Sequence, residues 1–135
     1  MARLSVLALS ARLPGWAEEA CAEYARRMPK GYEVARIPVK NEAALRSALP
    51  RSARLVALDE RGKERTTRQF AELLKSATAF VIGGPDGLSE ELKGKAELLL
   101  RVSSFTLPHA LAQVVLLEQL YRAASLLTGH PYHRE

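Results

Sequence analysis

Short apolar runs alternate with stretches of helical periodicity along the whole chain. The runs suit strands that are buried on both faces, and apolar residues spaced three or four apart suit helices packed against them. The predicted strands are Leu4–Leu9, Tyr32–Val39, Arg54–Leu58, Phe80–Ile82 and Leu98–Val102. The predicted helices are Pro14–Met28, Asn41–Leu49, one that opens at Thr66, a short one after Ser89 and a long one from Pro108. This alternation predicts an α/β fold, a mostly parallel sheet flanked by helices.

Polar residues indicate where the shorter helices begin. Asn41 and Ser89 are candidate N-caps, and Thr66 with Gln69 forms a capping-box pattern. Between the third strand and Thr66, the sequence DERGKER is predicted as a charged loop. Pro38 indicates that the second strand ends there or lies at an edge of the sheet, because proline cannot donate to a neighbouring strand.

The helix that follows Pro108 is apolar almost all round rather than along one stripe. A helix of that kind has to be covered on two sides, whereas a single sheet covers one. A second copy of the chain is the predicted cover for the other side, with Leu116 or Leu120 at the contact. A membrane span is the competing interpretation, but Glu118 and Arg122 interrupt the run and are spaced for an ion pair on a helix surface.

The composition is that of one ordinary globular domain. The 135 residues are 47% hydrophobic and 26% charged, and we interpret residues 1–135 as a single domain. The one cysteine, Cys21, cannot form an internal disulfide, which favours a reducing, cytoplasmic setting. A net charge of +5 favours an acidic partner such as nucleic acid, although many basic proteins bind none.

Three predicted strands run into loops that suit a ligand. Leu58 is followed by Asp59, Ile82 by the sequence GGPDG, and Val102 by SSFT. Ligands of open α/β sheets bind beyond the carboxyl ends of the strands, and glycines let a ligand approach the backbone closely. The glycine loop matches neither a dinucleotide-binding fingerprint nor a Walker A loop, so a plain tight turn is an equal alternative on this pattern alone.

The sequence VIGGPDGLS and the closing stretch SSFTLPHALAQVVLLEQLYRAASLLTGHPYHRE resemble the RlmH family of SPOUT-class methyltransferases. The resemblance extends to LSVLALSARLPGWAEEACAEYARRMP and LVALDERGKERTTRQFAELL, and so covers nearly the whole chain. The final HPYHRE is its most specific part, because nothing in the physics of a helix end requires that hexapeptide. The segment between Pro38 and Leu55 departs from the family, whose members carry a longer, lysine-rich segment there.

This resemblance implies a SPOUT-type fold with a C-terminal trefoil knot, a homodimer, and methylation of N3 of a pseudouridine in 23S ribosomal RNA on the ribosome. It implies S-adenosylmethionine as methyl donor and no metal. The implied cofactor-binding residues are Leu58, Gly83, Val102, Ser103, Ser104, Phe105, Thr106 and Leu107. A non-catalytic RNA- or nucleotide-binding module of the same fold is the alternative. The presence of both the glycine loop and the HPYHRE tail favours the enzyme.

The tail, residues 130–135, is dense in groups that donate, accept or carry protons. N3 of a uracil ring is a poor nucleophile until its proton leaves. We predict that His133 takes this proton and that Arg134 stabilises the developing anion. Tyr132 is predicted to position or stack on the substrate, and the division of roles among these residues and His130 stays open.

Other candidates have equally plain structural explanations. His109 is either a structural hydrogen-bonding group beside the cofactor loop or a second catalytic candidate. The histidines of the chain match no standard zinc spacing, which disfavours a metal site.

The best candidates for contact with RNA phosphates follow a strand end on the predicted ligand side: Arg61, Lys63, Arg65 and Arg68.

Overall fold

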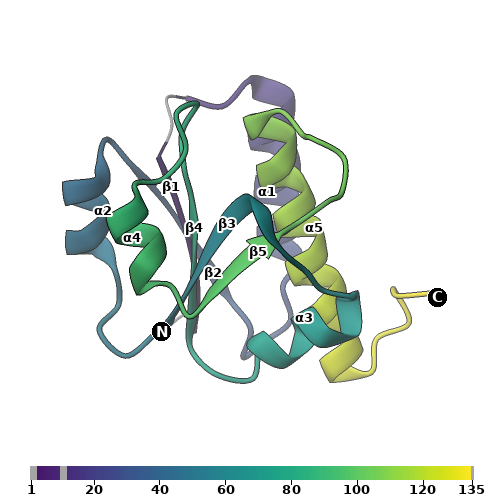
Figure 1. The fold of residues 1–135 in the computed structure, drawn as a ribbon. Coiled ribbons are helices and arrows are strands. Elements are labelled where there is room, and N and C mark those ends of the chain that lie inside the picture. The colour runs from purple at the N-terminus through teal and green to yellow at the C-terminus, as the bar shows by residue number, and fades with distance from the viewer. Residues whose placement is uncertain (1–2, 10–11, 135) are drawn as a thin grey trace.

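A computed structural model describes residues 3–9 and 12–134, and it confirms the predicted α/β fold (Figure 1). Five strands form one sheet in the order β2-β1-β4-β3-β5, with parallel neighbours. The strands are β1 (Leu4–Leu9), β2 (Val34–Val39), β3 (Arg54–Glu64), β4 (Thr78–Ile82) and β5 (Leu98–Arg101). The helices are α1 (Gly15–Arg27), α2 (Glu42–Ala48), α3 (Thr67–Leu73), α4 (Glu90–Lys95) and α5 (His109–Thr128).

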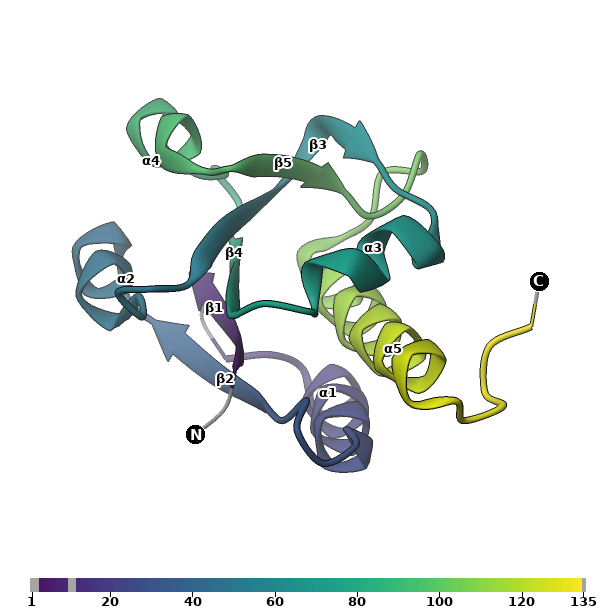
Figure 2. The same ribbon diagram turned by 90° about the horizontal axis from the view of Figure 1, so that it is seen from below.

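Helices cover both faces of the sheet (Figure 2): α1, α3 and α5 lie on one face, and α2 and α4 lie on the other. Successive residues of a strand point to opposite faces. In β1, Leu4 and Val6 pack in the larger core with α1, α3 and α5, whereas Leu7 packs in the smaller core with α2 and α4. Because both faces are buried, the central strands need continuous apolar runs, which is the pattern the sequence shows.

The predicted helix caps are present. The Asn41 side chain accepts a hydrogen bond of 2.8 Å from the backbone N–H three residues on. Thr66 and Gln69 form a complete capping box, and the Ser89 hydroxyl accepts from the backbone three residues on. The position of β2 at the edge of the sheet explains how the strand accommodates Pro38.

The prediction of a loop for DERGKER is wrong. β3 continues to Glu64, and its register against β5 shifts between Leu58 and Lys63. Pairing with β5 outweighs the weak strand propensity of these charged residues, which is the usual effect of tertiary context on strands. A glycine is needed in the bulge, because a Cβ on Gly62 would lie 2.5 Å from the carbonyl oxygen of Leu99.

α5 is covered within one chain more fully than its sequence suggests. α1 and α3 pack along its flanks, and the sheet lies beneath it (Figure 2). Leu116 and Leu120 are completely buried in this core, so the prediction that one of them contacts a second copy is wrong. The large apolar residues that remain exposed on these helices are Trp16 (56%) and Leu111 (37%), in the first turns of α1 and α5. None of the helices in the described ranges has the length and hydropathy of a membrane span.

Candidate functional site

A cleft of about 540 Å³ lies beside the bulge of β3, where β4 and β5 end and α5 begins. It is the predicted ligand side of the sheet, at the carboxyl ends of the strands. Of the predicted cofactor-binding residues, Ser104 does not line the cleft. The others do: Leu58, Gly83, Val102, Ser103, Phe105, Thr106 and Leu107. The structure therefore brings together the bulge of β3 and the loops after β4 and β5, which are far apart in the sequence.

The glycine loop that forms one wall of the cleft is closed on itself. Gly84 and Gly87 form an antiparallel bridge, with a 2.9 Å hydrogen bond from the Gly87 N–H to the Gly84 carbonyl oxygen. Gly87 has φ +75°, a conformation that favours glycine. A Cβ on Gly83 would lie 2.6 Å from the Gly87 carbonyl carbon. Glycine is thus required at position 83 for closure of the loop.

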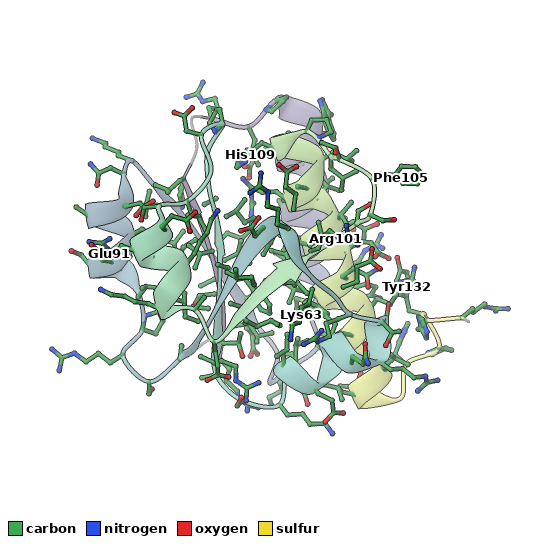
Figure 3. The ribbon with its side chains drawn as sticks, in the orientation of Figure 1. Lys63, Glu91, Arg101, Phe105, His109 and Tyr132 are labelled. Atoms are coloured by element: carbon green, nitrogen blue, oxygen red, sulfur yellow. The ribbon has the colours of Figure 1, made fainter. Side chains whose placement is uncertain are left out.

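The loop between β5 and α5 supplies a second wall. The Ser103 hydroxyl accepts a 2.9 Å hydrogen bond from the Phe105 N–H, which fixes a tight turn. Phe105 is 82% exposed and points away from the body of the protein (Figure 3). Val102 and Leu107, by contrast, are half-buried and leave apolar surface at the cleft.

Charged residues line the side of the cleft formed by β3 and α4. The Asp59 carboxylate accepts the Arg61 N–H at 2.9 Å and pairs with Lys93 at 3.1 Å. The Arg61 N–H, followed by Lys93, lowers the pKa of Asp59, so its charge is retained well below neutral pH. Arg101, which pairs with Glu64 at 2.6 Å, also lines the cleft. Sequence reasoning missed Lys93 and Arg101, because neither belongs to a motif and only the fold brings them to the cleft.

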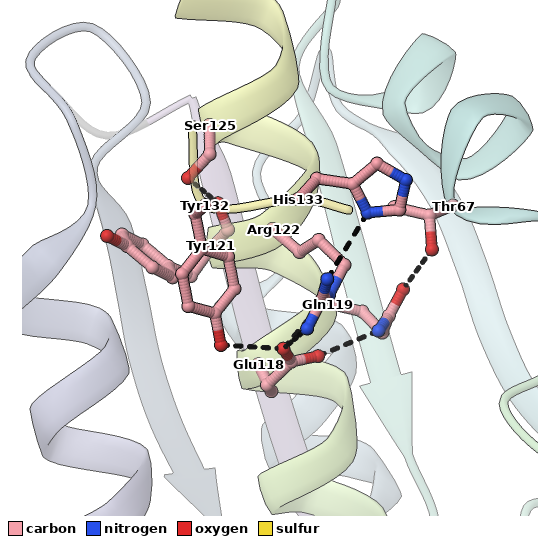
Figure 4. A network of polar contacts seen from close by, with 8 residues as sticks. All are labelled: Thr67, Glu118, Gln119, Tyr121, Arg122, Ser125, Tyr132 and His133. Carbon is pink, nitrogen blue, oxygen red and sulfur yellow. Dashed lines mark hydrogen bonds and ion pairs between the residues drawn. The ribbon is translucent and has the colours of Figure 1, made fainter. Parts of the chain in front are cut away.

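The tail does not lie beside the cleft of its own chain but folds back on α5 (Figure 4). The Tyr132 hydroxyl donates to Glu118 at 2.9 Å, and its ring makes an edge contact with Tyr121 at a centroid distance of 4.6 Å. The Arg122 guanidinium lies 4.7 Å from the centre of the same ring. Burial and the nearby Glu118 carboxylate raise the pKa of Tyr132, so its hydroxyl keeps its proton and acts as a donor.

The predicted proton acceptor, His133, is held in the same network. Arg122 donates to Glu118 at 2.8 Å, and its Nη1 lies 3.2 Å from Nδ1 of His133. Since a guanidinium only donates, Nδ1 is the acceptor in this contact and its lone pair is occupied. Arg134 is exposed, and Glu135 lies outside the described residues.

The tail and the cleft lie on different sides of α5. Ala112 lines the cleft, whereas Glu118, which binds the tail, is six residues further along. At 3.6 residues per turn, that separation places the two side chains about 120° apart around the helix. Figure 2 shows the tail on the side of α5 that faces away from the sheet, and in Figure 3 Tyr132 is well separated from His109. Within one chain, the predicted catalytic and cofactor-binding residues are therefore not brought together.

The remaining groups near the cleft include one histidine. His109, the first residue of α5, lines the cleft, and burial lowers its pKa. Within residues 3–9 and 12–134, no group of three or more His, Cys, Asp or Glu side chains is placed to hold a metal ion.

Comparisons with known proteins agree on one family. The family model described as "Predicted SPOUT methyltransferase" matches residues 2–133. The chain is 43% identical over 155 residues to ribosomal RNA large subunit methyltransferase H of Laribacter hongkongensis (strain HLHK9), covering 98% of this chain and 99% of that protein. It is 45% identical over 154 residues, with the same coverage, to the protein of that name from Burkholderia thailandensis.

A solved structure shares the fold. The SpoU methyltransferase AviRb from Streptomyces viridochromogenes, crystallised in complex with the cofactor AdoMet, matches with a TM-score of 0.54 and 16% identity. The match covers 88% of this chain and 56% of AviRb.

Proposed function

This chain belongs to the SPOUT methyltransferase family, and from that premise we propose that it transfers a methyl group from S-adenosylmethionine to large-subunit ribosomal RNA. The observation that carries the proposal is sequence identity of 43% and 45% with two relatives, each named ribosomal RNA large subunit methyltransferase H. The match extends over nearly the full length of this chain and of each relative. The net charge of +5 suits a substrate whose backbone is an anion at every nucleotide.

The cleft fits the cofactor in size and in lining. Its volume of about 540 Å³ falls within the roughly 300–1,000 Å³ of typical small-molecule sites. Leu58, Val102 and Leu107 suit the apolar faces of an adenine ring, and the loop backbones offer N–H and C=O groups to its edge. When bound, S-adenosylmethionine supplies an activated methyl group on a sulfonium leaving group.

The finer proposal is that the accepting atom is N3 of a pseudouridine in 23S ribosomal RNA on the ribosome. The chain then has to orient the base and remove the N3 proton. His133 is the proposed proton acceptor, and the exposed Arg134 stabilises the developing anion. His133 takes a proton only after its contact with Arg122 opens, because the Nδ1 lone pair is otherwise occupied. Tyr132, whose hydroxyl stays protonated, positions the tail rather than removing a proton.

We also propose that the protein is a homodimer in which the tail of each protomer completes the cleft of its partner. Two observations support this. The tail and the cleft of one chain lie on different sides of α5, so a site that needs both is incomplete in a single chain. Trp16 and Leu111 leave exposed apolar surface in the first turns of the two neighbouring helices α1 and α5, and the first turn of α5 also lines the cleft.

A complementation experiment tests the shared site. One variant carries Leu107→Arg, which fills the cleft, and the other lacks Tyr132 to Glu135. Each alone should transfer almost no methyl group. A one-to-one mixture, refolded together, should recover about a quarter of wild-type activity, because half of the dimers are mixed and each mixed dimer has one complete site. Inactive mixed dimers, verified by mass, would show that the tail does not act on the partner.

The substrate class is tested with methyl-labelled S-adenosylmethionine and purified ribosomal subunits. Label should enter the RNA of the large subunit, and the Leu107→Arg variant should transfer none. RNA binding without any transfer by the wild-type protein would support the alternative, a non-catalytic binding module of the same fold.

A further inference from the structure

A second cleft, of about 380 Å³, lies beside the carboxyl-terminal halves of β1 and β2. Val6, Ala8 and Gln113 are buried and form its floor, whereas Arg12 is exposed and lies at its mouth. β1 runs parallel to both β2 and β4, so the second cleft lies at the same edge of the sheet as the proposed cofactor cleft. Figure 1 shows the starts of α1 and α5 and the loop after β4 at this same end of the molecule.

The two clefts meet at one pair of side chains on α5. His109 lines the cofactor cleft, and Gln113, one turn further along the helix, lines the second cleft. Nε2 of His109 lies 3.0 Å from Nε2 of Gln113, so the two side chains are in contact. The glycine loop also reaches the end of β1, because a Cβ on Gly84 would lie 2.9 Å from the carbonyl oxygen of Leu9. The clefts are therefore neighbours, one turn of α5 or about 5.4 Å apart along the helix.

The lining of the second cleft combines apolar surface, one amide and charged groups at the mouth. Gln113 is 3% exposed, and its carboxamide can both donate and accept hydrogen bonds. Glu18 accepts two hydrogen bonds from Arg36, of 2.8 and 3.0 Å, which use two of the five N–H donors of that guanidinium. Arg12 adds a second guanidinium, so two arginines and one carboxylate give the lining a net positive charge.

These groups suit a nucleotide better than they suit a simple anion. A carboxamide at the floor is complementary to the edge of a base, which presents donors and acceptors side by side. Leu13 and Pro38 suit the apolar faces of the ring, and guanidinium groups at the mouth suit a phosphate, which they can bind through two parallel hydrogen bonds. The volume of about 380 Å³ falls within the roughly 300–1,000 Å³ of typical small-molecule sites.

We propose that the second cleft binds the RNA nucleotide next to the one that is methylated. Gln113 reads the edge of its base, and Arg12 and Arg36 hold its phosphate. The contact between His109 and Gln113 stands between the clefts, so a base in the second cleft does not face the methyl donor, and the adjoining nucleotide of the same strand lies at the cofactor cleft. Sequence-specific recognition of RNA commonly uses bases turned out of the stack in this way. The inference rests on the proposed function, because the ligand is the RNA substrate.

Turnover of large ribosomal subunits by Arg12→Gln tests the phosphate contact. KM for the subunits should rise about five- to tenfold, as expected for one lost contact, whereas kcat and the affinity for S-adenosylmethionine should stay within about twofold of wild type. The slope of log affinity for RNA against log salt should become shallower by about one.

Arg51→Gln is the matched control, because Arg51 is equally exposed but precedes β3 at the opposite edge of the sheet. It should change neither KM nor the salt slope. Equal effects of the two variants would show only a general attraction between charges, and would overturn the proposal. Loss of kcat at unchanged KM in Arg12→Gln would overturn it too, since that residue would then act in the chemical step.

Nuclear magnetic resonance tests the class of ligand with uridine 5′-monophosphate as the probe. S-adenosylmethionine is present in excess, so that the cofactor cleft is filled. Millimolar nucleotide should shift the side-chain amide signal of Gln113 and the Nε–H signal of Arg36, whereas inorganic phosphate should shift only the arginine signal. A nucleotide that shifts the arginine signal alone, or neither signal, overturns the proposal. If both signals shift but the protein methylates no RNA, the proposed function fails while the nucleotide site stands.

Discussion

At the scale of single residues, glycine is required where two stretches of backbone meet. The structure distinguishes such glycines from glycines that have open space around them. A Cβ on Gly62 would lie 2.5 Å from a backbone oxygen of Leu99, whereas a Cβ on Gly94, in α4, would meet nothing within 4 Å. We expect Gly62→Ala to lower the free energy of unfolding by about 1–3 kcal/mol, because the bulge has to shift. Gly94→Ala should raise it by about 0.5–1 kcal/mol. Denaturant titration measures both, and equal effects of the two changes would contradict the close approach at Gly62.

The lowered pKa of His109 makes a second prediction at this scale. Burial is the cause of the shift, so the folded protein binds a proton at this ring less readily than the unfolded chain, whose histidines titrate near pH 6.5. The unfolded state therefore gains protons first as the pH falls. The free energy of unfolding should decrease from about pH 6.5 downwards, until the pH reaches the folded-state pKa. His109→Gln should show a smaller decrease in the same denaturant titrations, and identical pH profiles would contradict the assignment.

At the scale of elements, the sequence predicted those features that local chemistry determines. The cap at Asn41 and the capping box at Thr66 involve residues three apart, so they are visible in the sequence and the structure confirms them. The continuation of β3 to Glu64 depends on pairing with β5, more than thirty residues away, and no local pattern reports that. The same limit applies to the cleft. The sequence predicted its cofactor-binding segments one at a time, but it did not show that Lys93 and Arg101 lie beside them.

The tail is a second element whose packing the sequence did not show. Tyr132 contributes an aromatic contact with Tyr121 and a hydrogen bond to Glu118. We expect Tyr132→Ala to lower the free energy of unfolding by about 1–2 kcal/mol, and Tyr132→Phe, which keeps the ring, by about half as much. Thermal or denaturant unfolding checks this. Unchanged stability in both variants would show that the tail is not docked on α5 in solution.

At the scale of the whole molecule, self-association is the property that a single chain does not display. The proposed contact surface includes Leu111, which is exposed and lies outside the core. Leu111→Lys should therefore weaken the dimer without unfolding the protomer. The matched change Ser47→Lys, on α2 at the opposite face of the sheet, should have no effect. Light scattering at micromolar concentration measures the mass, and a wild-type monomer would contradict the homodimer.

The trefoil knot stays a prediction from the family resemblance. Hydrophobic periodicity reports which face of an element is buried, but it does not report whether a segment passes through a loop. Knots are also exceptions to the ordinary rules of chain connection, so those rules give no guide here.

Methyl transfer to one kind of atom in large-subunit RNA can be observed by mass spectrometry of the modified RNA. Ribosomes from cells that lack the modification are incubated with the protein and isotope-labelled S-adenosylmethionine, and the 23S RNA is digested and sequenced by fragmentation. We expect one labelled methyl group, on N3 of a pseudouridine. Label on a ribose oxygen, on another base, or on no ribosomal RNA at all would contradict it.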